Sequence, residues 1–273
     1  MLDRYLTGAE ISAARYFVWR ILEEIPAELI QASIFGSKAR GEARSDSDVD
    51  ILLVFRALPP DREPHAGMAE ATAEQVAAQT GVPVTVWSVS LPDLAPGERT
   101  PMLVDALEDA IPIWCWPQPL LPVSFMPADA LRCSTALLER VREGSLEFAD
   151  RALDGDAAAA ARRARDDVVR LGTALLLLKG MTRFRRGEVV EELLTGDFAG
   201  SSPPAPARLV LDWVRLSFGP SGRDEDRPIV PPPGGLLALT RTVDYLRGQV
   251  RRAAHELAAA RSVGTPFDEA VYS

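Results

Sequence analysis

The chain of 273 residues is long enough for one large or two ordinary domains, and 47% of its residues are hydrophobic, which suffices for a packed core. Its formal net charge is −9, from 30 basic and 39 acidic residues. Because such an acidic surface repels a nucleic-acid backbone, general RNA or DNA binding is disfavoured. The longest aliphatic stretch, at residues 174–178, is far too short to span a membrane.

The first residues lack the apolar core of a signal peptide, so we expect a cytoplasmic protein. The cysteines, Cys115 and Cys133, show no CxxC spacing and have no histidine cluster beside them. Neither a zinc site nor a disulfide framework is therefore expected.

The first part of the chain alternates helical and strand patterns. Apolar residues recur with a helical period over residues 9–25, and Pro26 ends that pattern. The apolar runs 29–35 and 49–55 predict buried strands, and the alternation over 82–90 predicts a third. We expect further helices near 65–80 and 100–110, followed by a short apolar run at 111–114. These patterns predict an α/β (α+β) domain with a small mixed sheet over residues 1–118.

A Pro-rich segment, residues 116–122, interrupts this pattern, and we expect a linker at 119–126. The remaining sequence, residues 127–273, predicts an all-α helical bundle. Its helices are expected at about 127–150, 155–179, 187–195, 206–217 and 234–261, with loops at 197–205 and 219–235.

The residues around the first two strands carry the candidate chemistry. Gly36 and Ser37 end an apolar run, where backbone N–H groups and a hydroxyl can cradle phosphates, and Arg40 can add positive charge. Asp48 and Asp50 lie two residues apart on an expected strand, so both point to one face. Two carboxylates this close repel unless a cation lies between them, and Mg²⁺ prefers such oxygens. The pattern predicts a site for a nucleoside triphosphate and Mg²⁺.

The string from Gly36 to Asp50 resembles the signature of the DNA polymerase β-like nucleotidyltransferase superfamily. It is most similar to the small bacterial members called minimal nucleotidyltransferases, found in antitoxins and antibiotic-modifying enzymes. The resemblance covers about residues 9–115. It implies that Gly36, Ser37 and Arg40 bind the nucleotide, and that Asp48 and Asp50 are catalytic residues that hold Mg²⁺. The implied reaction moves a nucleoside monophosphate, here expected to be AMP from ATP, to an acceptor hydroxyl.

The acceptor stays open between a small molecule, as in aminoglycoside-modifying relatives, and a protein hydroxyl, as in antitoxins that modify their toxins. The resemblance also allows a homodimer. The alternative hypothesis is a catalytically lapsed nucleotidyltransferase fold that acts as a binding module, antitoxin-like or regulatory.

The sequence departs from the family pattern at its third carboxylate, which completes the metal site and acts as a base. The matching position on the third strand is Thr85 or a neighbour, and no acid is found there. Other carboxylates lie downstream but off that strand, at Asp93, Glu98 and Asp105. Because some relatives take the base from the second domain, three further candidates are Glu188, Glu191 and Glu192.

Residues 158–180 resemble a core helix of HEPN-type domains, which are commonly paired with minimal nucleotidyltransferases, and the resemblance covers about 125–200. A generic substrate-binding bundle is the alternative. HEPN ribonucleases carry an arginine and a histidine with four to six residues between them. Arg251 and His255 leave only three intervening residues and miss that motif, so a nuclease is disfavoured and His255 is expected to be a structural or surface histidine.

Overall fold

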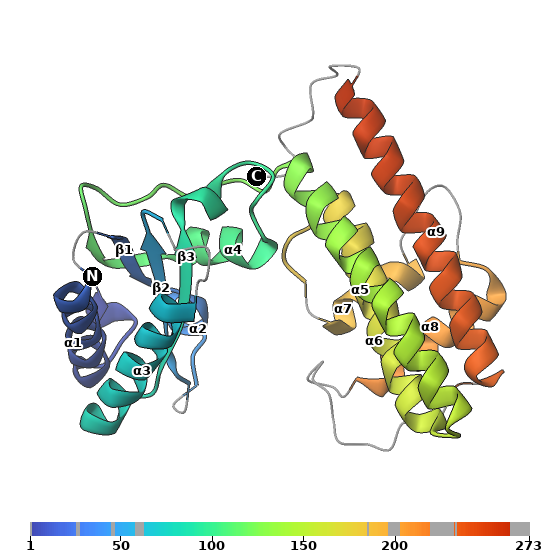
Figure 1. Ribbon diagram of the computed structural model, residues 1–273, viewed down its shortest axis with the longest axis horizontal. Coiled ribbons are helices and arrows are strands. Elements are labelled where there is room, and N and C mark those ends of the chain that lie inside the picture. The colour runs from blue at the N-terminus through green and yellow to red at the C-terminus, as the bar shows by residue number, and fades with distance from the viewer. Residues whose placement is uncertain are drawn as a thin grey trace. The chain divides into compact units, whose positions relative to one another are not determined.

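The computed structural model describes residues 2–25, 28–44, 47–57, 63–184, 186–195, 203–218, 232 and 234–262 (Figure 1). The chain divides into two compact units, Met1–Ser124 and Phe125–Ser273. This division falls inside the segment expected as a linker. The first unit combines a mixed four-stranded sheet with helices, and the elements of the second are helices, so the expected fold class is confirmed.

Strands β1 and β2 form the centre of the sheet. β1 (Leu29–Ile34) pairs antiparallel with β2 (Val49–Phe55) and with β4 (Ile111–Cys115), while β3 (Val84–Ser90) runs parallel to β2. The order is therefore β3-β2-β1-β4. The two central strands are buried on both faces except at Asp50, which explains their continuous apolar runs.

The side chains of β2 alternate between two hydrophobic cores. Residues 51, 53 and 55 lie in the core formed with α1 (Gly8–Glu24) and α3 (Glu63–Thr80). Residues 52 and 54 lie in a second core formed with α4 (Pro101–Asp109). Since alternate residues of a strand share a face, Asp50 lies on the α4 face of the sheet.

The second unit is organised around α6 (Ala157–Leu178), whose alanine- and leucine-rich surface is buried along most of its length. It packs against α5 (Pro127–Leu153), α9 (Gly235–Ser262), α7 (Arg186–Thr195) and α8 (Ala205–Ser217). The expected helices are all present, with ends that differ by a few residues. The loops expected at 197–205 and 219–235 lie mostly outside the described residues.

Within the described ranges, no helix combines the length and hydropathy that a membrane span requires. Cys115 and Cys133 are both half-buried, and neither forms a disulfide within the described ranges.

Candidate functional site

A sharp turn after β1 places Gly36 beside the carboxylate of Asp50. The backbone N–H of Phe35 donates to the carbonyl of Asp50 at 3.1 Å, and Gly36 then takes a positive φ of 72°. A Cβ at Gly36 would lie 2.7 Å from Asp50 Oδ2. Only glycine satisfies both the backbone conformation and this close approach, so the turn leaves the space beside that oxygen open.

A short helix, α2 (Gly36–Ala39), follows this turn, between the strands expected at 29–35 and 49–55. Four residues are too few to show a helical hydrophobic period, which is why the pattern did not reveal it. Ser37 is half-buried on α2, and its hydroxyl makes no hydrogen bond within the described part of the chain.

Asp48 and Asp50 lie at the start of β2, on the face that the sequence predicts. Asp48 is exposed just before the strand, and Asp50 is half-buried within it. Burial raises the pKa of Asp50, and the nearby charge of Asp48 raises it further, while Lys38 and Arg40 act in the opposite direction. The two carboxylates thus repel each other at a place that favours a bound cation.

These residues fit a divalent cation such as Mg²⁺. Carboxylate oxygens are the hard ligands that this ion prefers, and it usually takes one or two of them together with substrate phosphates. The bare backbone at Gly36 keeps Asp50 Oδ2 accessible, because a side chain there would fill the space next to it. The donor set therefore suits an ion that arrives with a triphosphate.

The third-strand position expected to carry the missing acid is Thr85 or a neighbour. Thr85 pairs in register with Asp50, and its Oγ1 donates to Asp48 Oδ2 at 3.0 Å. Among the described residues, no group of three or more histidine, cysteine or acidic side chains is arranged to hold a metal. The third carboxylate that the sequence lacks on the third strand is therefore also missing beside Asp48 and Asp50, among the described residues.

The acids downstream of β3 lie in other elements. Asp93 Oδ2 accepts from the backbone N–H and the hydroxyl of Ser90, both at 2.8 Å, and so caps a short 3-10 helix, η2 (Leu91–Leu94). Glu98 follows that helix, and Asp105 lies within α4. None of these three acids lies on β3.

The three acids considered in the second unit all lie on α7. Glu191 Oε1 accepts from Arg215 Nη1 at 3.3 Å. The role of Glu188, Glu191 or Glu192 as a base stays a prediction.

Arg40 ends α2 and is tied to two carboxylates. It donates to Asp109 Oδ2 at 2.7 Å and to Glu42 Oε2 at 2.9 Å. The hydrogen bond with Asp109 is the larger cause that raises the pKa of Arg40. Binding a phosphate through this guanidinium therefore requires it to share or release these partners, and its nucleotide role stays a prediction.

Sequence reasoning missed Lys38 as a contributor to the site. Its side chain is only 5% exposed, and its Nζ lies 2.6 Å from Glu10 Oε1 on α1. Its charge also lowers the pKa of Asp50. The only signal in the sequence was a charged residue within the Gly-Ser-Lys-Ala-Arg string, because Glu10 lies 28 residues earlier.

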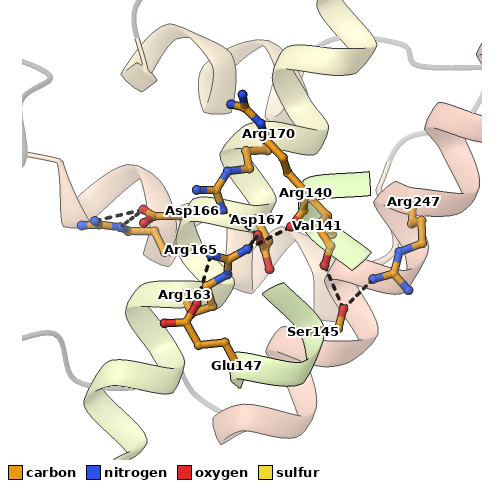
Figure 2. A network of polar contacts seen from close by, with 10 residues as sticks. All are labelled: Arg140, Val141, Ser145, Glu147, Arg163, Arg165, Asp166, Asp167, Arg170 and Arg247. Atoms are coloured by element: carbon orange, nitrogen blue, oxygen red, sulfur yellow. Dashed lines mark hydrogen bonds and ion pairs between the residues drawn. The ribbon is translucent and has the colours of Figure 1, made fainter. Parts of the chain in front are cut away.

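In the second unit, an ionic network joins α5 and α6 (Figure 2). Arg163 donates to the carbonyl of Arg140 at 3.0 Å and pairs with Glu147 at 3.2 Å and Asp167 at 3.3 Å. Asp167 also pairs with Arg170 at 2.8 Å. Burial raises the pKa of Asp167, and the two arginines that face it oppose that effect. The network stabilises the contact between the helices.

A cavity of about 320 Å³ lies between α5, α6 and α9. Its walls include Phe148, Val243 and the buried Asp167, with Arg247 at one side. Arg247 already donates to Ser145 Oγ at 3.1 Å (Figure 2), and Asp167 is paired with arginines. Both charged groups therefore already have partners within the helix bundle.

The late helix α9 carries both Arg251 and His255, and both side chains are exposed. His255 is therefore a surface histidine, one of the two alternatives expected from the sequence.

Comparison with known protein families gives a match within the first unit. Residues 18–111 match the family model of the nucleotidyltransferase domain. The match includes the turn at Gly36 and both carboxylates, so it supports nucleotidyl transfer in general. It ends before the second unit, whose HEPN resemblance stays a prediction.

Two solved structures are similar to the chain. Spectinomycin adenyltransferase AAD(9) from Enterococcus faecialis, with ATP and spectinomycin, is 14% identical, with a TM-score of 0.48 over 90% of this chain and 100% of that one. A nucleotidyltransferase-like protein from Exiguobacterium sibiricum 255-15 is 13% identical, with a TM-score of 0.41 over 93% and 81%. No curated protein matches the chain.

Proposed function

We propose that the protein is a Mg²⁺-dependent nucleotidyltransferase that moves AMP from ATP to a hydroxyl group. The observation that carries this proposal is the close approach of Gly36 to Asp50 Oδ2, with Asp48 on the same strand face. It combines a turn that admits phosphate with a pair of carboxylates, within the residues that match the family. Both features are needed to position a triphosphate and neutralise its charge.

In this reaction the acceptor oxygen forms a bond to the α-phosphorus, and the bond from that phosphorus to the β-bridging oxygen breaks. Pyrophosphate leaves, and the hydroxyl proton passes to a base. Asp48 and Asp50 would hold the Mg²⁺, which offsets the charge of the triphosphate when bound. The N–H groups that follow Gly36 and the hydroxyl of Ser37 would bind phosphate oxygens, and Arg40 would support them.

The proposed acceptor is a hydroxyl of either a small molecule or a protein. The proposal leaves the base unassigned, because β3 offers no carboxylate beside Asp50. General base catalysis contributes on the order of 10²–10⁴-fold, so transfer remains measurable when the base is suboptimal.

A second candidate function is a nucleotide-binding module without transfer activity, antitoxin-like or regulatory. Thr85 at the position of the third acid favours this alternative, because it removes both a ligand and a base. The turn and the carboxylate pair would still bind nucleotide and cation. Both functions therefore require binding of nucleotide and cation, and only the first includes transfer of a nucleotidyl group.

The test uses purified protein, Mg²⁺ and host lysate with nucleoside triphosphates labelled at the α-phosphate. We expect label from ATP to move to a protein or small-molecule fraction. Asp48→Ala and Asp50→Ala should abolish transfer while the protein stays folded by circular dichroism. Glu70→Ala, which removes an exposed carboxylate from α3 in the same unit, is the matched control and should transfer normally.

Full activity in either aspartate variant would contradict the metal assignment. Mg²⁺-dependent binding of ATP without any transfer would favour the binding module instead.

A further inference from the structure

The edge between β2 and β3 determines which side chains can join the two carboxylates. Parallel pairing sets Val49 opposite Val84 and Asp50 opposite Thr85. By the same register, Pro83 lies beside Asp48, and its carbonyl accepts from the N–H of Val49 at 2.9 Å. Because paired residues of neighbouring strands share a face, residues 83 and 85 are the β3-side neighbours of the carboxylates. Neither proline nor threonine brings a negative charge.

Thr85 also restricts Asp48. Its hydroxyl donates to Asp48 Oδ2 at 3.0 Å, so one lone pair of that oxygen is used and the carboxylate is held in one orientation. A β-branched side chain has few χ1 rotamers, which makes this hydrogen bond a stiff support. Asp48 Oδ1 takes no part in that hydrogen bond and would be the oxygen that faces a ligand beside Asp50.

We propose that this site binds a single divalent cation together with the nucleotide, and that Thr85 is a positioning residue that orients Asp48 for it. This inference rests on the proposed function and specifies its metal stoichiometry. Thr85 occupies the position at which an acidic side chain would allow a second cation to bind.

The test counts Mn²⁺ by electron paramagnetic resonance in the full-length protein saturated with α,β-methylene-ATP, which cannot release pyrophosphate. We expect one bound Mn²⁺ per protein–nucleotide complex in the wild type and two in Thr85→Asp. A count of two in the wild type, or of one in Thr85→Asp, would overturn the proposal.

The Mn²⁺ affinity of Thr85 variants tests whether Thr85 positions Asp48. Thr85→Val keeps the shape of the side chain but removes the hydroxyl, so we expect one Mn²⁺ bound about two- to tenfold more weakly. Thr85→Ser keeps the donor and should restore the wild-type affinity. Equal Mn²⁺ affinities in Thr85→Val and the wild type would contradict the role of Thr85 in orienting Asp48.

Failure of the proposed function gives a different result. A wild-type protein that binds neither Mn²⁺ nor the nucleotide analogue would reject the nucleotide site as a whole, and with it the stoichiometry that depends on it.

Discussion

At the scale of single residues, Gly36 and Asp50 depend on each other. Gly36 has a φ of 72°, and its missing side chain leaves room for the carboxylate. The glycine is therefore required twice, once by the backbone and once by the neighbouring oxygen. Gly41 shares only the backbone requirement. Its φ is 71°, but a Cβ there meets nothing within 4 Å.

The first prediction compares these two glycines. Gly36→Ala and Gly41→Ala should each lower the free energy of unfolding by roughly 1–2 kcal/mol, because a left-handed conformation is unfavourable for alanine. Gly36→Ala alone should also abolish ATP binding, since its Cβ displaces Asp50 Oδ2. Urea denaturation and calorimetric titration with Mg²⁺-ATP measure both effects. Normal ATP affinity in Gly36→Ala would count against the turn as part of the site.

At the scale of elements, α2 is held from two sides although it is only four residues long. Lys38 ties it to Glu10 on α1, and Arg40 ties it to Asp109 at the end of α4. An isolated helix of this length is unstable, so these ion pairs support its position. The Lys38–Glu10 pair is the more buried of the two, which makes loss of one partner costly.

The second prediction concerns the pair between α1 and α2. Glu10→Gln should lower the free energy of unfolding by about 1–3 kcal/mol at neutral pH, because it leaves Lys38 buried without its charge partner. In the double variant Glu10→Gln/Lys38→Met, the loss should be smaller than the sum of the two single losses. Urea denaturation of all four proteins gives this coupling, and additive losses would argue against a stabilising pair.

The third prediction is the pH dependence of this pair. Burial acts to raise the pKa of Glu10, but the hydrogen bonds from Lys38 and Thr7 outweigh it, and the pKa lies below its usual 4.5. Its stabilisation is therefore present above about pH 4.5 and is lost as the pH falls through the lower, folded-state pKa. The difference in unfolding free energy between the wild type and Glu10→Gln should shrink from pH 6 to pH 3. A difference that stays constant over this range would reject the assignment.

At the scale of the whole molecule, the residues proposed to bind nucleotide and metal all lie in the first unit, while the network of Figure 2 stabilises the second. Gly144 on α5 is central to that network, because any side chain there would overlap the guanidinium of Arg163. The helices α5 and α6 therefore meet through an arginine packed on a glycine. Stability of the second unit and binding by the first can be tested separately.

The fourth prediction uses this difference. Gly144→Ala should lower the free energy of unfolding of the second unit by about 1–3 kcal/mol, because the displaced Arg163 loses buried partners. Gly248→Ala on α9 is the matched control, since a Cβ there meets nothing within 4 Å. It should instead stabilise that unit by roughly 0.5–1 kcal/mol. Thermal unfolding gives the stabilities, and the ATP affinity should be unchanged in both variants. A loss of ATP binding in Gly144→Ala would show that the site extends beyond the first unit.

The sequence alone determined the features that depend on neighbours along the chain. Hydrophobic periodicity located the expected helices and β3, because burial of one face imposes a local pattern. Continuous apolar runs located β1 and β2, which are buried on both faces. The spacing of Asp48 and Asp50 was enough to place both on one face. The absence of an acid near Thr85 was also visible without a structure.

Only the tertiary structure decided the features that depend on register and topology. The β2–β3 pairing set Thr85 opposite Asp50 and brought its hydroxyl to Asp48. The fold also brought Glu10, near the start of α1, to Lys38 on α2 across 28 residues of sequence. Such contacts join segments that are distant in the sequence, and the local pattern of one segment does not indicate its partner. They form only when strand order and helix placement bring the two segments together.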